Sequence, residues 1–230
     1  MTGWSDVITA ALNIIDDPNW RDELATNPAQ FYRAKSQCVS LAYPMLSKPP
    51  ELLHYIESGM STPSYGDVVW VSTTESTQGQ TVVPTGMTGF ELCSVSVRSA
   101  DGTEYFPYPN TTYDAETGNV TFPIQQSAGV EYSIDFYTDG QFADLSASQM
   151  RLMALAVAVV WDDRFQRDWL SNTLKLDDDS FKHANESNYM RQTNERYIAN
   201  ISSFNDELRD YEQLCAYSKA VGNYNSAYLR

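Results

Sequence analysis

One stretch near the end of the chain constrains the fold more than any other feature. Neither Pro nor Gly, the two residues least compatible with a helix interior, occurs from Phe181 to about Val221. The sparse apolar residues of this stretch recur at helical spacing: Tyr189, Tyr197, Ile201, Phe204, Leu208, Tyr211, Leu214 and Cys215. The predicted helix is roughly 60 Å long at about 1.5 Å per residue. Because a compact monomer of 230 residues needs no helix of that length, we expect a partner along it.

A second helix is predicted before it, from about residue 146 to residue 171. Ser146 and Gln149 fit a capping box, in which two residues three positions apart satisfy each other's backbone N–H groups. This helix is apolar nearly all round, which is typical of a helix buried by other helices. Its large apolar residues include Leu152, Leu155, Val159, Val160, Phe165 and Trp169.

The first 64 residues also show helical periodicity. The first set is Trp4, Ile8, Ala11, Leu12 and Ile15, with Ser5 as a candidate N-cap. Asp17-Pro18 ends this helix, and a short helix with Trp20 and Leu24 stops near Asn27-Pro28. A further set comprises Phe31, Ala34, Cys38, Leu41 and Met45, and a last short helix runs from Pro49-Pro50 through Ile56.

Residues 65–145 have a different composition, in which Val, Thr, Tyr and Ser are common and turn signals recur. Strands are predicted at 67–72, 90–99, 103–108, 111–113, 119–124 and 130–138, with turns at 100–102 and 116–118. Six or seven short strands at such spacing favour a small antiparallel β-sandwich or barrel. The sequence therefore predicts an α+β fold. Segments 1–64 and 146–230 form one helical bundle, and 65–145 is an inserted acidic β-domain.

The inserted domain holds most of the excess negative charge. The chain has 15 Lys and Arg against 30 Asp and Glu, a net charge of −15. Residues 65–145 hold 11 acidic residues and one base, Arg98. This excess of acidic residues argues against non-specific binding to nucleic-acid phosphates, which needs clustered Lys and Arg. Two interpretations stay open: a solvated face that aids solubility, and an acidic docking surface.

The N-terminal sequence lacks the pattern of a secretory signal, because no basic residue precedes its apolar part and acidic residues follow. The longest apolar run, Met153 to Trp161, has nine residues, whereas a membrane span takes about 20. We therefore expect a soluble protein made in the cytoplasm. Cys38, Cys93 and Cys215 lie far apart, and we expect three buried free thiols.

The sequence has no motif for bond chemistry. Neither histidine, His54 or His183, lies in a metal-ligand or nucleophile motif, and glycine motifs for phosphate binding are missing. The acidic clusters Asp16-Asp17, Asp162-Asp163 and Asp177-Asp178-Asp179 do not match a calcium loop. We interpret them as helix ends and solvated turns. No catalytic residue, metal or cofactor is expected.

The chain closes on a polar and aromatic segment after Gly222. Tyr and Arg are enriched among the residues that anchor protein interfaces. We therefore expect this segment to contact a partner through Asn223, Tyr224, Asn225, Tyr228, Leu229 and Arg230.

The order of these features resembles a known family. A helical segment and a β-rich insertion precede an apolar helix that ends in aromatic and basic residues (AVAVVWDDRFQRDWL), a long polar helix (ELRDYEQLCAYSKA) and a tail rich in Tyr and Asn (NYNSAYLR). This layout is similar to the head–tail adaptors of short-tailed bacteriophages, of the tail tubular protein A or gatekeeper type. The variant it resembles most is the ring protein in the tails of crAss-like phages. The likeness covers nearly the whole chain.

The resemblance implies a structural virion protein without enzymatic activity. Such adaptors form a homo-oligomeric ring, usually of twelve copies, below the portal protein and extend the DNA channel into the tail. It implies contacts with the portal and with other tail ring or nozzle proteins, and DNA that passes without specific binding. The protein would be made in the cytoplasm of the bacterial host and would reside in the tail or connector of the virion, away from membranes.

Two other classes of function stay open. A glycan- or receptor-binding module would use aromatic side chains of the β-domain as stacking surfaces: Trp70, Tyr105, Phe106, Tyr108, Tyr113 and Tyr137. Alternating aromatic residues in short strands more often form the core of a sandwich. An enzyme with a pair of carboxylates, such as a glycan hydrolase, has no motif in its favour.

Overall fold

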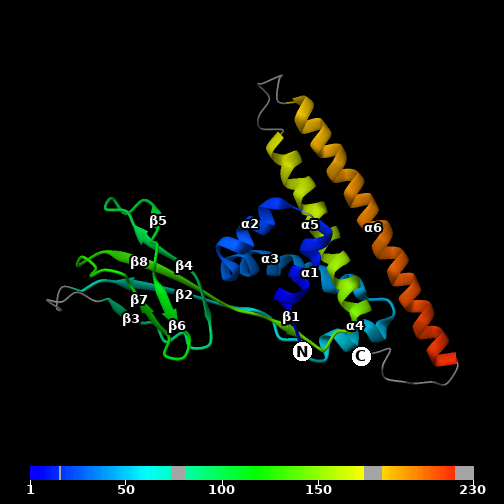
Figure 1. Cartoon of the computed structure of the whole chain (residues 1–230), viewed down its shortest axis with the longest axis horizontal. Coiled ribbons are helices and arrows are strands. Elements are labelled where there is room, and N and C mark those ends of the chain that lie inside the picture. Colours follow the sequence, from blue (N-terminus) through cyan, green and yellow to red (C-terminus); the bar gives the residue numbers. More distant parts are fainter. Residues whose placement is uncertain (16, 74–80, 174–182, 221–230) are drawn as a thin grey trace. The chain divides into compact units, whose positions relative to one another are not determined.

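The computed structural model describes residues 1–15, 17–73, 81–173 and 183–220 (Figure 1). Its helices are α1 (Trp4–Ile15), α2 (Pro18–Thr26), α3 (Pro28–Ala42), the 3-10 helix η1 (Tyr43–Leu46), α4 (Pro50–Glu57), α5 (Ala147–Thr173) and α6 (His183–Ala220). Its strands are β1 (Thr2–Gly3), β2 (Ser64–Val71), β3 (Val82–Pro84), β4 (Glu91–Arg98), β5 (Tyr105–Pro107), β6 (Thr112–Asp114), β7 (Asn119–Thr121), β8 (Glu131–Thr138) and β9 (Gln141–Phe142). Helices precede and follow the antiparallel strands, so the predicted α+β class is confirmed.

The chain divides into two compact units. The helical unit comprises Met1–Pro18, Lys35–Ser61 and the described residues from Gln141 onward. The β unit comprises Asn19–Ala34 and Thr62–Gly140. These boundaries differ from the predicted ones, because residues 19–34 group with the strands and not with the helical bundle.

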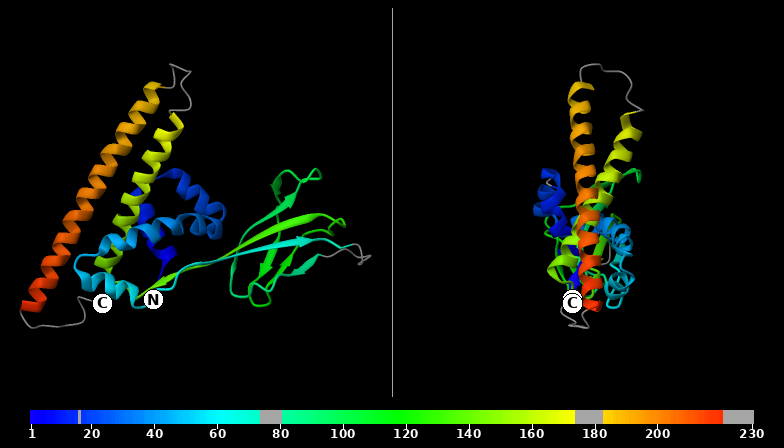
Figure 2. Two further views of the ribbon diagram at one scale, coloured as in Figure 1. Left: turned by 180° about the vertical axis from the view of Figure 1, so that it is seen from behind. Right: turned by 90° about the vertical axis from the view of Figure 1, so that its right-hand side faces the viewer.

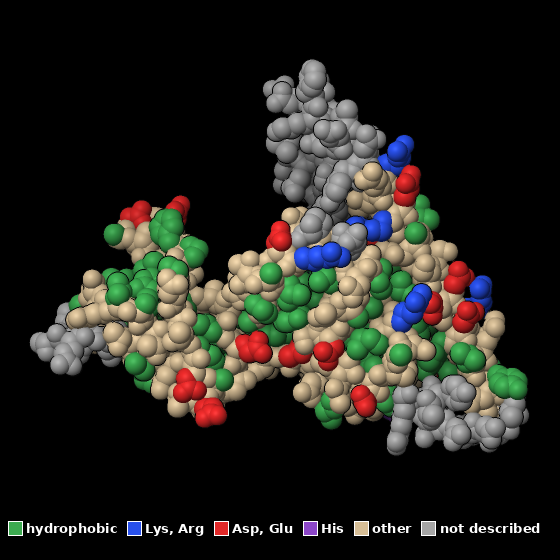
Figure 3. Space-filling model, in the orientation of Figure 1, with side chains coloured by type: hydrophobic (Ala, Val, Ile, Leu, Met, Phe, Trp, Pro, Cys, Tyr) green, Lys and Arg blue, Asp and Glu red, His purple; other side chains and the backbone are tan. Residues whose placement is uncertain are grey.

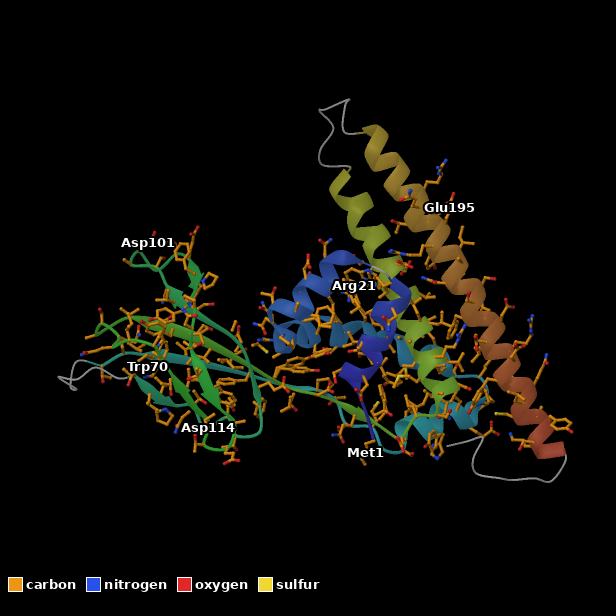
Figure 4. All side chains as sticks on the ribbon, viewed as in Figure 1. Met1, Arg21, Trp70, Asp101, Asp114 and Glu195 are labelled. Carbon is orange, nitrogen blue, oxygen red and sulfur yellow. The ribbon has the colours of Figure 1, made fainter. Side chains whose placement is uncertain are left out.

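The β unit is a small sandwich of two antiparallel sheets. One sheet has the order β2-β8-β4-β5 and the other the order β3-β7-β6. Val83 and Val120 of the smaller sheet share a core with Val95, Ile134 and Phe136 of the larger one. Trp70, labelled in Figure 4, packs its ring 5.3 Å from those of Phe122 and Tyr132 in the same core.

The turn predicted at residues 116–118 joins β6 to β7. Gly118 there has a φ of +69°, and a Cβ on it would lie 3.0 Å from the Met87 backbone nitrogen. Both observations favour glycine at this position.

Helix α2 and the start of α3 belong to the β unit because the larger sheet offers them a buried patch. A register shift between Leu92 and Ser94 interrupts the alternation of β4. Cys93, at this irregularity, is buried in a cluster with Ala29 and Tyr137. The Asn27 side-chain amide donates a hydrogen bond of 2.5 Å to the Cys93 carbonyl. Sequence periodicity could not predict this docking, because the irregularity in β4 creates it.

The helical unit is built around α5, which contacts both α1 and α6. The predicted capping box is confirmed: the Ser146 N–H donates to Gln149 Oε1 at 2.8 Å, and the Gln149 N–H donates to Ser146 Oγ at 3.4 Å. The Trp4 ring of α1 stacks on Phe142 of β9 at 5.2 Å. These contacts fix the start of α5 against the N-terminal segment.

The buried face of α3 differs from the predicted stripe. Ala34 and Leu41 are exposed, whereas Lys35 and Val39 are buried. Lys35 Nζ lies 4.6 Å from the centre of the Trp161 ring, which gives the buried ammonium a cation–π contact. A search for apolar residues alone does not detect such a position.

Candidate functional site

The α5–α6 hairpin is the most extended feature of the helical unit, and its two helices lie side by side in both views of Figure 2. Helix α6 has 38 residues, or about 57 Å at 1.5 Å per residue. The predicted long helix is therefore confirmed in extent. Its described side chains bury one narrow seam, made of Thr193, Asn200, Phe204, Tyr211 and Cys215.

The seam positions follow one another at intervals of seven or four residues. One interval of each kind makes a repeat of eleven residues, or about 3.67 residues per turn, which is close to the 3.6 of a straight α-helix. The seam is therefore a single stripe along one side of α6. Most of the described α6 side chains outside the seam face solvent. Among them Ile198, Leu214 and Tyr217 are more than half exposed. The surface of α6 is therefore large and available for packing.

A buried polar group fixes the middle of the hairpin. Asp162 of α5 has no exposed side-chain surface. Its Oδ1 accepts hydrogen bonds from Arg196 Nε at 2.9 Å and Nη2 at 2.5 Å, and its Oδ2 accepts one from Asn200 Nδ2 at 2.9 Å. Arg196 Nη1 also donates to the Ile15 carbonyl at the end of α1 at 2.8 Å. One ion pair thus joins α1, α5 and α6.

The Asp162 site corrects one prediction. The sequence predicts Asp162-Asp163 at a helix end or solvated turn, but Asp162 lies inside α5 and is buried. Burial raises its pKa, while Arg196 and Asn200 act in the opposite direction. Asp16 and Asp177 to Asp179 lie outside the described residues.

A second polar contact fixes the hairpin nearer the start of α5. Gln149 Nε2 donates to the Tyr211 hydroxyl at 3.0 Å, and both side chains are buried. Burial raises the pKa of Tyr211 to about 12. Arg151 Nε and Glu207 Oε1 form an ion pair of 2.6 Å on the same side of the hairpin. The capping glutamine therefore also sets the register of α6 against α5.

The β unit supports only part of the glycan-binding alternative. Tyr137 is buried, and Trp70, Tyr108 and Tyr113 pack against the sandwich core. Only two of the six named aromatic residues, Tyr105 and Phe106, are about half exposed. The Tyr105 hydroxyl is bonded to Glu131, which also pairs with Arg98. The described aromatic residues therefore serve mainly as core.

Acidic side chains of the β unit gather at its turns. Asp101 lies in the turn between β4 and β5, and Asp114 ends β6; both are exposed and labelled in Figure 4. Figure 3 shows acidic groups (red) at two places on this unit. Arg33, from the docked α3, contacts Asp67 at 3.4 Å and Asp135 at 3.6 Å. The docked segment thus neutralises part of the charge on the sheet.

The described residues contain no cluster of three or more His, Cys, Asp or Glu side chains suited to a metal ion. Among the described helices none has the length and apolar content of a membrane span. The three cysteines are buried and free, as predicted. His183 has no described side chain, and His54 is exposed on α4. The predicted partner-binding residues, Asn223 to Arg230, lie outside the described residues.

Comparison of the chain with known protein families, with curated proteins and with solved structures gives no match.

Proposed function

We propose that the chain is a structural virion protein that forms an oligomeric ring below the portal, joining head to tail and lining or extending the DNA channel. The observation that carries the proposal is α6, a helix of 38 residues that buries a single described seam. A helix of this length that is covered on one stripe is well suited to packing beside other copies.

Ring closure needs two different surfaces on each subunit. A heterologous contact, in which one face meets another face of the next copy, closes into a ring when the rotation fits. The exposed faces of α6 offer such surfaces. Leu214 and Tyr217 on α6 supply apolar contacts there. The internal ion pair at Asp162 keeps the hairpin in one geometry during assembly.

The charge of the chain suits a channel through which DNA slides. A net charge of −15 repels phosphates at moderate salt. Packaged DNA would then pass the ring without binding to it. In this proposal the partners are further copies of the chain, the portal and other tail ring or nozzle proteins. Residues 223–230 provide a contact to a neighbouring subunit or to the portal.

Negative-stain electron microscopy of the chain with its cognate portal, beside the chain alone, tests the proposal. Rings with a central hole, free or on the portal, are the expected result. A chain lacking residues 222–230 should form fewer rings and keep the far-UV circular dichroism of the full chain. Monomers under both conditions would contradict the proposal, and a glycan array would then test the Tyr105 and Phe106 surface.

A further inference from the structure

The larger sheet of the β unit ends in a long strand that has a partner on one side only. In the order β2-β8-β4-β5, strand β2 pairs with β8 over all eight of its residues. Within the described residues no strand pairs with its other side, which we call the β2 edge. An edge of this kind presents a row of N–H and C=O groups to which a further strand can bind. The β2 edge is therefore a candidate docking site.

The other three edge strands of the sandwich are protected against such pairing. β3, β5 and β6 have three residues each. Two of them also carry a proline, Pro84 in β3 and Pro107 in β5. Short strands and prolines are common devices against the binding of a further strand. β2 has eight residues and no proline, so a strand that binds the sandwich through its backbone fits best at the β2 edge.

The register of β2 determines which of its backbone groups face the β2 edge. Ser72, which directly follows the strand, donates its N–H to the Val130 carbonyl at 2.9 Å on the β8 side. In an antiparallel pair every second residue exchanges hydrogen bonds with the partner strand. Counting back from Ser72, the N–H and C=O groups of Asp67, Val69 and Val71 therefore point away from β8. They are the groups that a further strand would bind.

The side chains of the same three residues define what kind of segment fits. Val69 is 62% exposed and Val71 is 47% exposed, so apolar contacts are available beside the edge. Asp67 lies opposite Asp135 of β8. The two carboxylates share one guanidinium, that of Arg33, at 3.4 and 3.6 Å. Since one base serves two acids, a net negative charge remains beside the β2 edge.

We propose that the β2 edge binds an extended segment of another protein, in which Lys or Arg alternates with apolar residues, as a fifth strand of the larger sheet. Apolar side chains of that segment lie beside Val69 and Val71, and a basic side chain lies opposite Asp67. Opposite charges on directly paired residues stabilise a strand pair, whereas like charges destabilise it.

The charge of the β unit favours a basic partner over a second copy of the chain. Residues 19–34 and 62–140 together hold 12 Asp and Glu against three Arg, a net charge of −9. Two such units repel each other, whereas a segment rich in Lys or Arg is attracted. This inference goes beyond the proposed ring and does not depend on whether rings form.

Fluorescence anisotropy of the labelled peptide KVTVTKTK with the full chain tests the proposal. Aligned antiparallel to β2, this peptide places Val opposite Val69 and Val71 and Lys opposite Asp67. The peptide KVTPTKTK has the same charge but lacks the N–H opposite Val69, and it should bind at least tenfold more weakly. Equal binding of the two peptides, or binding of neither, would overturn the proposal.

A charge exchange tests the contact at Asp67. Asp67→Lys should weaken binding of KVTVTKTK at least tenfold and should gain binding of EVTVTETE, in which Glu replaces each Lys. Glu104→Lys is the matched control, because it changes the net charge equally at an exposed position outside β2, and it should leave the binding of both peptides unchanged. Equal effects of the two substitutions would contradict the placement at the β2 edge.

Hydrogen exchange of the unaltered chain, followed by NMR, gives a measurement that needs no variant. The amides of Val69 and Val71 should exchange at least tenfold more slowly with KVTVTKTK bound, whereas those of Val68 and Trp70 already face β8 and should change little. No added protection at Val69 and Val71 would overturn the proposal. Self-association of the chain that protects these two amides without peptide would also overturn it and would assign the β2 edge to a second copy.

Discussion

Asp162 is fully buried, and its carboxylate accepts all of its hydrogen bonds from two residues one helical turn apart on α6. Ion pairs of this kind are weak evidence for stability, because desolvation of the charges offsets their attraction. Removing one partner is strongly destabilising, because the other charge is then left in the interior without compensation. The Asp162–Arg196 pair therefore specifies how α1, α5 and α6 meet.

Asp162→Ala should lower the free energy of unfolding by about 3–5 kcal/mol, since Arg196 loses its partner in a partly buried position. Asp206→Ala is the matched control on the same hairpin. Asp206 pairs with Arg209 at 3.0 Å, but both side chains are about 60% exposed, and such pairs contribute about 1 kcal/mol or less. Urea unfolding measures both variants. Equal decreases in unfolding free energy for the two variants would show that the buried pair contributes no more than an exposed pair.

The stability of the folded state should fall at high pH because of the Cys93 thiol in the β unit. Burial raises the pKa of its thiol to about 11, against the opposing effect of Arg33. As the pH rises from about 9 to 11, the unfolded chain releases this proton while the folded chain retains it, so the folded state loses stability. The loss should be about 2 kcal/mol greater than in Cys93→Ala, because one pKa unit corresponds to about 1.4 kcal/mol. Parallel slopes of unfolding free energy against pH would contradict this expectation.

At the scale of elements, the docking of α2 and the start of α3 on the larger sheet decides where the units divide. Ala29 is 6% exposed against Cys93 and Tyr137. Tyr137 follows the three residues of β8 that alternate into the sandwich core, Tyr132, Ile134 and Phe136. It points to the other face of the sheet, where the docked helices cover it. The β unit is therefore completed by a segment from before its first long strand.

Ala29→Glu should release residues 19–34 from the sheet, because an unpaired carboxylate would be buried there at a cost of several kcal/mol. Tryptic cleavage after Arg21 and Arg33, followed by mass spectrometry, should become at least about tenfold faster, since about 1.4 kcal/mol corresponds to a factor of ten. Ala34→Glu places the same charge on an exposed position of α3 and should not change the rate. An unchanged cleavage rate in Ala29→Glu would contradict the docking on the sheet and would favour the predicted grouping of residues 19–34 with the helical bundle.

Local signals predicted most of these elements from the sequence. The breaks at Pro18 and Pro28, the Ser146 and Gln149 cap and the Gly118 turn each depend on residues a few positions apart, and the structure confirms them. Contacts between distant residues were not predicted. Asp162 and Arg196 are 34 positions apart, and Cys93 is buried because of an irregularity in β4.

At the scale of the whole molecule, the net charge of −15 governs encounters with nucleic acid. The chain should not retain duplex DNA in a gel-shift assay even at about 50 mM salt, where phosphate contacts are strongest. Replacing Asp101, Glu104 and Asp114 with Lys changes the net charge from −15 to −9 and places basic side chains on exposed turns of the β unit. Any retention by this variant should be weak and should fall as salt rises, because its bases lie at separate turns and phosphate binding needs clustered Lys and Arg. Retention by the unaltered chain would argue against a passive channel surface.

The short bridge between Ser61 and Gln141 bears on how such a chain is modified over evolution. Their backbones exchange two hydrogen bonds, of 2.8 and 2.9 Å, just before and just after the segment 62–140. The two ends of this segment therefore leave the helical unit side by side, like the two ends of a hairpin loop. Sites with paired ends of this kind tolerate the insertion or exchange of a whole segment. Recombination at this point could replace the sandwich while the α5–α6 hairpin stays intact. The residues that would have to change with it are those of 19–34, since they cover the sheet that would be lost.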